Sequence, residues 1–434
     1  MSVKTLYRIA AFEIRPLSYV NQLYYEMILP TNESTTRQKV VKKTQKFIGL
    51  SLLGLPALLG GFFSCSTRFL ATRLNPQPFM FMNTSLLETE PKKFPQQSSA
   101  LEGQRVVLKV FSWNVCAMSG GFPYATGGVR PWRQRLTDIA LEIKKRDADV
   151  VCLQEMHDND ASWRLIDELK SVYFYFYYNI GSPYFGANSG LFVASKYEIK
   201  NPQFSTFQSK IRLIDSCFTG KGYFSFELAL QNHKIVRLFN THFQHSQDDL
   251  TPLQTEKQVR EEQMSQIVST IQGQEKTSSA ETLFLIVGDF NTTPDEYNSS
   301  TYQNLFVNLL LSSTSSTMVE ERLRGAGVNQ EDGNGEEIGK AKETRFLQAS
   351  CFYQELMYKL WENRTVKDEN STIDYALVYK NEAVERDGFS ARTEIVDAEE
   401  VLAIDWGKEG EPEGVLDPQR ALSDHLPLMT TLMV

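Results

Sequence analysis

Apolar residues occur in two different patterns along this chain, and the change between them falls near residue 105. Before that point, residues 47–67 form one continuous stretch without any charged residue. After it, short apolar runs of strand length alternate with longer segments in which apolar residues recur every three or four positions. The short runs are typical of buried strands and the longer segments of amphipathic helices. Many strands interspersed with helices predict a layered α/β sandwich.

The strands and helices of this α/β region follow from where the apolar runs begin and end. β-branched and aromatic residues dominate the strand candidates, and the aromatic run 173–178 predicts an interior strand. Residues 231–234 separate two strand candidates and predict a hairpin. Strands are expected at 106–113, 150–153, 173–178, 189–194, 224–230, 235–240, 283–287 and 373–379, and helices at 133–146, 162–169 and 256–271.

The apolar stretch 47–67 is long enough to cross a bilayer as a helix, since about 20 residues suffice. It lies too far from Met1 for a cleaved signal peptide. Residues 37–46 carry several basic side chains, whereas only Arg68 and Arg73 follow closely. Because basic residues favour the cytoplasmic side, we expect a single-pass membrane protein with its C-terminal part on the non-cytoplasmic side. Two alternatives stay open: a buried helical hairpin, and a segment lying in the membrane interface.

These patterns divide the chain into four regions. Residues 1–46 form an N-terminal region with a basic end, and 47–67 form the transmembrane segment. Residues 68–104 are expected to be a linker, because Pro, Ser and Gln are frequent there. The α/β domain occupies 105–434. Within it, residues 312–345 are rich in Ser, Gly and Glu and predict a mobile surface insertion.

The composition narrows the class of protein without selecting a function. A chain of 434 residues, 41% of them hydrophobic, can bury a large core. The net charge of -8 disfavours a nucleic acid partner, because phosphate contacts need Lys and Arg, but it does not exclude a local basic groove. The five cysteines form no CxxC pair, which argues against zinc fingers. Cys116 and Cys152 adjoin apolar runs and are expected to be buried thiols.

Six short motifs place a polar side chain at or beside the end of an apolar run. One such group is usually only a turn former, but six of these types after six apolar runs would be an unusual coincidence. Carboxylates, amides and imidazoles at one rim of a sheet can bind a hard divalent cation and surround a phosphate. The motif residues are Asn114, Glu155, His242, Asp289 with Asn291, Asp374, and Asp424 with His425.

The order and form of these motifs resemble the endonuclease/exonuclease/phosphatase superfamily, which includes DNase-like enzymes and neutral sphingomyelinases. The resemblance covers residues 105–434 and is carried by Leu153-Gln154-Glu155, Asp289-Phe290-Asn291 and Ser423-Asp424-His425 among the other motifs. It implies a four-layered α/β sandwich of the DNase I-like type, with two facing sheets between helices. The active site of a metal-dependent phosphoric diester hydrolase would lie at one end of the sandwich.

The same resemblance implies a metal site. Glu155 would be the central ligand of Mg²⁺, with Mn²⁺ as a second candidate ion. A carboxylate suits Mg²⁺, which keeps several waters and accepts few protein ligands. Asn114 would complete the metal environment or contact the phosphate, and Asp424 would sit against the metal or its waters.

The remaining motif residues would act on the phosphate and the water. His425 would be the general base, and Asp374 would orient its ring. Asp289 and Asn291 would hold the phosphate and the attacking water, although Asp289 is also a second candidate for the base. His242 would donate to a phosphate oxygen and stabilise the charge of the transition state. His157 and His245 lie beside the motifs without matching them, and we predict that both are surface residues.

Three features favour sphingomyelin as the substrate, with phosphocholine and ceramide as products. Lys221-Gly222 follows Asp215 just before the hairpin, as a Lys-Gly does in neutral sphingomyelinases. Lys221 would bind the substrate phosphate or pair with Asp215 to switch a loop. The predicted membrane segment would bring the enzyme to a membrane lipid. The acidic composition disfavours a nucleic acid.

Three alternatives remain. The first is a DNase-like or RNase-like nuclease, since the Ile373-Asp374-Tyr375 form is shared with abasic-site nucleases. The second is a phosphoesterase of another phospholipid or of phosphoinositides; the inositol polyphosphate 5-phosphatases match less well, because their PAWCDR-type motif is absent. The third is an inactive scaffold that uses the fold for binding, which the complete set of motif residues disfavours.

Overall fold

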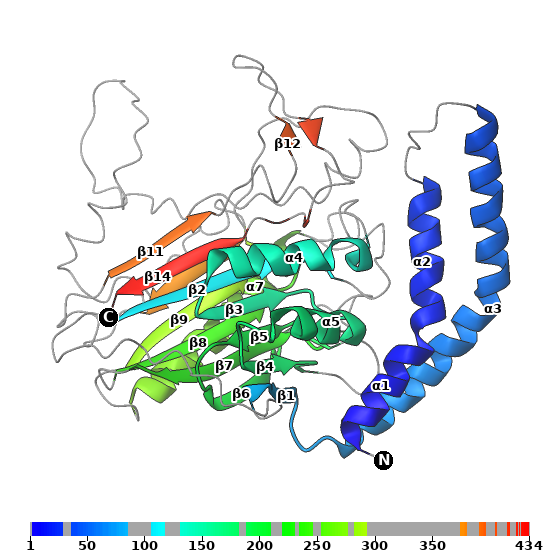
Figure 1. The fold of residues 1–434 in the computed structure, drawn as a ribbon. Helices are drawn as coiled ribbons and strands as arrows, with labels where there is room; N and C mark the ends of the chain where they lie inside the picture. The colour runs from blue at the N-terminus through cyan, green and yellow to red at the C-terminus, as the bar shows by residue number, and fades with distance from the viewer. Residues whose placement is uncertain are drawn as a thin grey trace.

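The computed structural model of the chain contains two large sheets, with helices on their outer faces and three further helices at the N-terminus (Figure 1). The predicted insertion 312–345 lies outside the described residues. The structure describes residues 2–28, 36–85, 106–117, 131–181, 188–209, 219–230, 234–245, 253–276, 282–292, 374–379, 390–395, 404–405, 415–416, 422–423, 425 and 427–433.

The first sheet has seven strands in the order β1-β4-β5-β3-β2-β14-β11. The strands β2 and β3 are parallel, and the other neighbours in this sheet are antiparallel. Side chains alternate along β2, so that Phe111 and Trp113 point to one face of the sheet and Leu108 and Val110 to the other. The strands are β1 (Met80–Asn83), β2 (Val107–Asn114), β3 (Val150–Gln154), β4 (Tyr175–Tyr178), β5 (Phe192–Ser195), β11 (Ser390–Ile395) and β14 (Leu428–Met433).

The second sheet has five strands in the order β10-β9-β8-β7-β6. Here β8 and β9 are parallel, and the other neighbours are antiparallel. The strands are β6 (Lys200–Thr206), β7 (Gly222–Ala229), β8 (Ile235–His242), β9 (Thr282–Asp289) and β10 (Asp374–Tyr379), and β12 (Ile404–Asp405) pairs with β13 (Val415–Leu416) apart from both sheets.

Three hydrophobic clusters divide the sandwich into four layers. One cluster joins the first sheet to α4 (Trp132–Arg146) and α5 (Asn159–Leu169), and another joins the second sheet to α7 (Leu253–Glu275). The third lies between the sheets, where Val110 and Cys152 of the first sheet meet residues such as Leu238 of the second. The predicted four-layered DNase I-like sandwich is therefore confirmed. Cys116 and Cys152 are buried and form no disulfide among the described residues, as predicted.

Three helices precede the sandwich: α1 (Val3–Glu13), α2 (Arg15–Ile28) and α3 (Thr36–Leu74). The first two pack against α3 and form a helical hairpin with it (Figure 1). Among the described residues, one stretch, Val40–Leu74 of α3, is long and apolar enough to cross a membrane. The predicted span 47–67 lies inside this stretch. It stays a prediction that α3 crosses a membrane, and on which side of the membrane the α/β domain would then lie.

The linker predicted at 68–104 is wrong for part of its length. Residues 68–74 continue α3, and Met80–Asn83 form β1, which pairs with the aromatic strand β4. The rings of Phe79 and Phe81 both contact Tyr177, so β1 extends the first sheet outside the boundary predicted at residue 105. A strand of four residues beside a Pro- and Ser-rich stretch is too short to give a periodic pattern.

Gly288 lies in β9 directly before Asp289, with a φ of 141°. A Cβ at this position would lie 2.0 Å from the carbonyl oxygen of Thr241 in β8. We therefore expect Gly288→Ala to lower the free energy of unfolding by about 1–3 kcal/mol, measured by urea denaturation. Gly273→Ala in α7 is the matched control, because its Cβ would meet no atom within 4 Å and should stabilise the helix by about 0.5–1 kcal/mol. Equal effects of the two substitutions would contradict this account.

Candidate active site

Five of the predicted site residues lie at strand ends that meet at one edge of the sandwich. The parallel pair β2 and β3 ends at Asn114 and Gln154, and the parallel pair β8 and β9 ends at His242 and Asp289. The strand β10 begins with Asp374 opposite Asp289. Because parallel strands end at the same edge of a sheet, two parallel pairs in facing sheets bring their last residues together. Glu155 directly follows β3.

Asn114 joins the two sheets at this edge through its side-chain amide. Its Nδ2 donates to Oε1 of Glu155 and to Oδ2 of Asp289, each at 3.0 Å. Its Oδ1 accepts a hydrogen bond of 3.0 Å from the backbone N–H of Cys116. In this arrangement Asn114 holds both carboxylates through the hydrogen bonds that its amide donates. Its contact with a metal stays a prediction.

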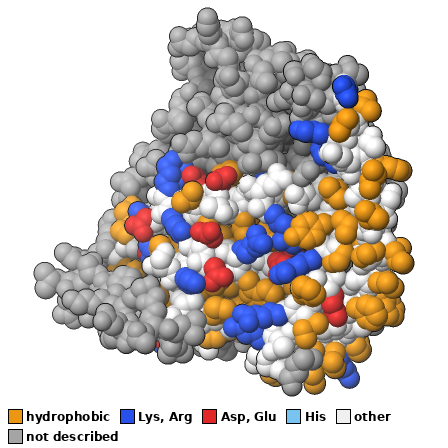
Figure 2. All heavy atoms as spheres, turned by 45° about the vertical axis from the view of Figure 1, so that its right-hand side comes forward, with side chains coloured by type: hydrophobic (Ala, Val, Ile, Leu, Met, Phe, Trp, Pro, Cys, Tyr) orange, Lys and Arg blue, Asp and Glu red, His pale blue; other side chains and the backbone are white. Residues whose placement is uncertain are grey.

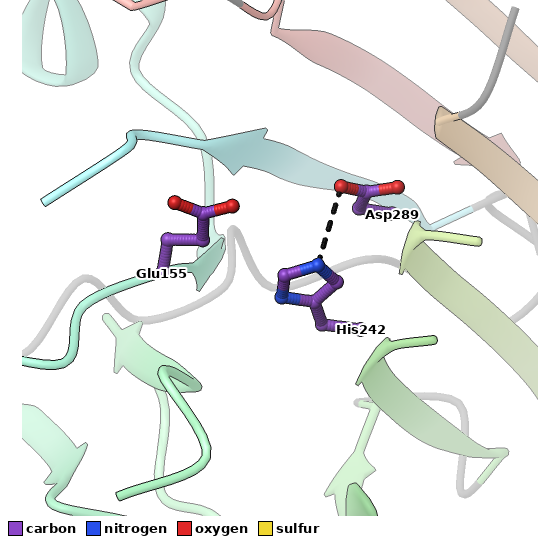
Figure 3. Close-up of side chains that lie close together, drawn as sticks. All are labelled: Glu155, His242 and Asp289. Carbon is purple, nitrogen blue, oxygen red and sulfur yellow. Dashed lines mark ion pairs between the residues drawn. The ribbon is translucent and has the colours of Figure 1, made fainter. Parts of the chain in front are cut away.

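Glu155, His242 and Asp289 form a cluster whose ligand atoms all lie within 4.8 Å of one another. Figure 3 shows Nε2 of His242 facing Asp289, with Oδ2 at 3.5 Å, and the carboxylate of Glu155 nearby. Two carboxylates this close repel each other in a site partly shielded from water. A divalent cation would relieve that repulsion, and the oxygen donors fit Mg²⁺ or Mn²⁺. The donor set thus fits the predicted metal, and Glu155 and Asp289 are the residues that would hold it.

His242 is buried and electrostatically unusual. Burial and then the nearby Lys221 ammonium lower the pKa of His242 well below its usual range. Its imidazole is therefore neutral near pH 7. In the part of the chain that the structure describes, no hydrogen-bond partner reaches Nδ1 of this ring. Because a buried polar atom normally has a partner, this nitrogen marks a place for a ligand group.

His425 and Asp374 form a buried pair on the other side of Asp289. Nδ1 of His425 lies 2.7 Å from Oδ2 of Asp374, and Nε2 lies 3.8 Å from Oδ2 of Asp289. A carboxylate that accepts from Nδ1–H leaves the lone pair of Nε2 facing the site. Asp289, Asp374 and His425 also place ligand atoms within 4.8 Å of one another, so Asp289 belongs to both clusters.

The backbone around His425 is attached to the end of β2. Nε1 of Trp113 donates to the carbonyl oxygen of His425 at 2.9 Å. Ser423 Oγ donates to the carbonyl oxygen of Asn114 at 2.7 Å and accepts from the backbone N–H of His425 at 3.2 Å. These bonds hold the imidazole at the same edge as Asn114. Asp424, the predicted second metal carboxylate, lies outside the described residues.

Lys221 and Asn291 meet at one backbone oxygen beside the cluster. Nζ of Lys221, which is buried, donates to the carbonyl oxygen of Phe243 at 2.8 Å. Nδ2 of Asn291 donates to the same oxygen at 3.3 Å, and its backbone N–H donates to Oδ1 of Asp289 at 2.8 Å. A buried ammonium and an amide next to the carboxylates can hold a phosphate. Asp215, the predicted partner of Lys221, lies outside the described residues.

The surface position predicted for His157 is wrong. This residue is buried, and its Nδ1 lies 3.1 Å from the carbonyl oxygen of Asn188. A Cβ at Gly190 would lie 2.7 Å from the His157 ring and 2.9 Å from Cα of Glu155. Gly190 therefore allows this chain segment to pack against the loop that carries Glu155. The only signal in the sequence was the position of His157 two residues after Glu155. His245 is half-buried.

A pair of side chains, Gln154 and Asn240, links the two sheets and was also not predicted from the sequence. Nε2 of Gln154 in β3 donates to Oδ1 of Asn240 in β8 at 2.8 Å. Nδ2 of Asn240 donates back to the carbonyl oxygen of Leu153 at 3.2 Å. Both amides are buried, so these bonds set the separation of the two strands just below Glu155 and His242.

Comparisons with known proteins agree with this fold. The sequence profile of the Endonuclease/Exonuclease/phosphatase family matches residues 111–425. A search of curated proteins found no match.

Several solved structures are similar to this chain at low sequence identity. Beta toxin 275-280 from Staphylococcus aureus has 18% identity and a TM-score of 0.50, and the match covers 74% of this chain and 99% of that one. Sphingomyelinase C from Streptomyces griseocarneus has 20% identity and a TM-score of 0.49, with 75% and 99% covered. Truncated TDP2 from Caenorhabditis elegans has 14% identity and a TM-score of 0.44, with 76% and 98% covered.

Proposed function

Because this chain belongs to the endonuclease/exonuclease/phosphatase family, whose members are phosphoesterase hydrolases, we propose that it is a metal-dependent phosphodiesterase that hydrolyses sphingomyelin to phosphocholine and ceramide. One observation supports the chemistry above the others. Asp289 stands between a cluster suited to a cation, with Glu155 and His242, and a pair suited to proton transfer, His425 and Asp374. Metal binding and proton transfer within one site are what hydrolysis of a phosphodiester by water requires.

The proposed mechanism assigns proton transfer to His425. Asp374 fixes the tautomer in which Nδ1 carries the proton, so that Nε2 of His425 accepts the proton of the attacking water. The water oxygen then bonds to phosphorus, the bond from phosphorus to the ceramide oxygen breaks, and that oxygen takes up a proton from solvent and leaves as the hydroxyl of ceramide. A carboxylate of Asp289 at the same edge is the second candidate for the proton acceptor.

Other side chains in the site would bind the phosphate. Lys221 and Asn291 lie beside Asp289 and would contact its non-bridging oxygens, to which His242 would donate. Bound Mg²⁺, held by Glu155 and Asp289 with Asn114 and Asp424 as predicted further contacts, would neutralise charge on the phosphate and the leaving oxygen.

The choice of sphingomyelin among phosphodiesters has four supports. Lys221 and Gly222 occupy the position that resembles the Lys-Gly of neutral sphingomyelinases. Burial of Lys221 next to Asn291 and Asp289 is consistent with a role on substrate phosphate. The long apolar helix α3 would bring the enzyme to its lipid, and the net charge of -8 disfavours a nucleic acid.

A side-by-side assay of the full-length protein tests the substrate. We expect phosphocholine release from sphingomyelin micelles in the presence of Mg²⁺, falling at least ~10²-fold when the metal is removed with EDTA. Lysophosphatidylcholine, phosphoinositides and plasmid DNA are assayed under the same conditions. Cleavage of DNA without release of phosphocholine would mean that the protein is a nuclease and not a sphingomyelinase. Turnover of phosphoinositides alone would point to a different lipid phosphoesterase.

A further inference from the structure

Within the helical hairpin, α1 and α2 cover one side of the apolar helix α3. At the middle of the apolar stretch, a Cβ on Gly60 would lie 2.2 Å from the carbonyl oxygen of Glu13, so the junction of α1 and α2 lies directly against α3. One turn further on, Ser64 Oγ donates to the carbonyl oxygen of Ala10 at 2.7 Å. The buried residues of α3 are small or polar, namely Ala57, Ser64, Arg68 and Ala71.

The hairpin is also attached to the α/β domain. Arg15 at the start of α2 makes two hydrogen bonds to the carboxylate of Asp160 in α5, at 2.8 and 3.3 Å. Arg133 of α4 donates to Ser18 of α2 at 3.3 Å. A small apolar cluster of Leu6, Tyr7 and Ala71, with Met80 and Trp163 packed against it, adds a further contact.

These contacts conflict with a bilayer that surrounds α3 on all sides. Glu13 and Arg15 lie at the level of Gly60, the middle of the predicted span, and Arg15 is bound to Asp160. A crossing in this arrangement would bring these charged groups to the centre of the bilayer, where charged side chains are strongly unfavourable. For α3 to cross the bilayer, α1 and α2 would therefore have to separate from α3, and the ion pair between Arg15 and Asp160 would have to break.

The opposite side of α3 is exposed and apolar. Its side chains are 66–74% exposed at Leu52, Leu55, Leu58 and Phe62. Spacings of three and four residues put them on one side of a helix. Figure 2 shows hydrophobic side chains gathered over the N-terminal helices at the right. We call this surface the outer face of α3; it also includes Phe47, Ile48, Leu59, Phe63, Phe69 and Leu70.

Charge at both ends of this helix identifies the occupant of the outer face. Exposed Arg37, Lys42 and Lys43 lie in its first turns, and exposed Arg73 lies in its last. An apolar stripe with basic ends matches the interface of a bilayer that contains anionic phospholipids.

We propose that α3 binds a lipid bilayer with its outer face only, and that it lies in one leaflet without crossing. The hairpin stays packed on α5, and the N-terminus and the α/β domain lie on the same side of the membrane. Since Asp160 is in the first turn of α5, directly after the loop that carries Glu155, the bound surface lies on the same side as the strand ends of the site (Figure 1). The proposal concerns binding and does not rest on hydrolysis.

Vesicle flotation of the full chain tests the outer face. We expect the double variant Leu55→Asp/Phe62→Asp to bind at least ~10-fold more weakly to phosphatidylserine-containing vesicles, because two apolar side chains that would be buried in the bilayer are replaced by carboxylates. Leu141→Asp is the matched control, since Leu141 is a similarly exposed leucine on α4. His425→Ala should bind as the unaltered protein does. Equal binding of the double variant and the control would overturn the proposal, provided both show the same thermal unfolding as the unaltered chain.

Protease digestion of terminal tags tests whether α3 stays in one leaflet. The sample is sealed membranes from cells that express the protein. Tags at the N- and C-termini should be either both digested or both protected when a protease is added outside. Protection of one tag alone means that the chain crosses the bilayer, which would overturn the proposal and favour the single pass expected from the sequence. Loss of phosphodiesterase activity with unchanged vesicle binding would count against the proposed function but not against this surface.

Discussion

Replacement of His425 by alanine is expected to lower kcat for phosphocholine release by about 10²–10⁴-fold, the range for loss of a positioned general base. The ring is buried, and Asp374 lies 2.7 Å from its Nδ1, so the substitution removes an oriented imidazole from the site. The measurement is the initial rate at saturating sphingomyelin and Mg²⁺.

Asp374→Asn separates orientation from proton transfer. An asparagine amide would donate to Nδ1 and move the proton of His425 to Nε2, where it blocks acceptance of the water proton. We expect a loss of kcat close to that of His425→Ala, with KM little changed. If His425→Ala retains more than about a tenth of the activity and Asp289→Asn does not, the base is Asp289 and our assignment of His425 is wrong.

Glu155→Gln should have the second large effect, a loss of at least ~10² in kcat together with weaker Mg²⁺ binding. The substitution keeps the shape of the side chain but removes one of the two carboxylates that Asn114 holds together. Calorimetric titration of Mg²⁺ measures binding, and initial rates over a range of Mg²⁺ concentrations measure activity.

Glu198→Gln is the matched control for this experiment. Glu198 is exposed and lies outside the site, so its replacement should leave both the metal titration and kcat unchanged. An unaltered Mg²⁺ affinity in Glu155→Gln would remove Glu155 from the metal site, even if the activity fell.

Much of the sandwich could be predicted because its strands carry a strong local pattern. In β2, Phe111 and Trp113 lie on one face of the strand, and Leu108 and Val110 lie on the other. A short run with apolar residues on both faces predicts a strand that is buried on both sides. Two strands that the sequence missed have weaker patterns: β6 is largely exposed, and β1 has four residues.

His157 illustrates why burial at the site was harder to predict than the site itself. A polar residue after a strand is normally exposed, and nothing local distinguishes His157 from such a residue. It is buried because Asn188 and Gly190, from a different part of the chain, pack over it. Burial of this kind depends on contacts that are distant in sequence, and a single sequence does not contain them.

The sequence by itself determined which side chains stand at or beside the ends of apolar runs, and therefore the candidates Glu155, His242, Asp289 and His425. It also determined that α3 is apolar enough to meet a membrane. Only the tertiary structure decided that these side chains share one site, and that α3 offers lipid a single face. The physical reason is that apolar periodicity reports the local surroundings of a residue. Distances between strand ends depend instead on register and on how two sheets pack, through links such as Gln154 to Asn240.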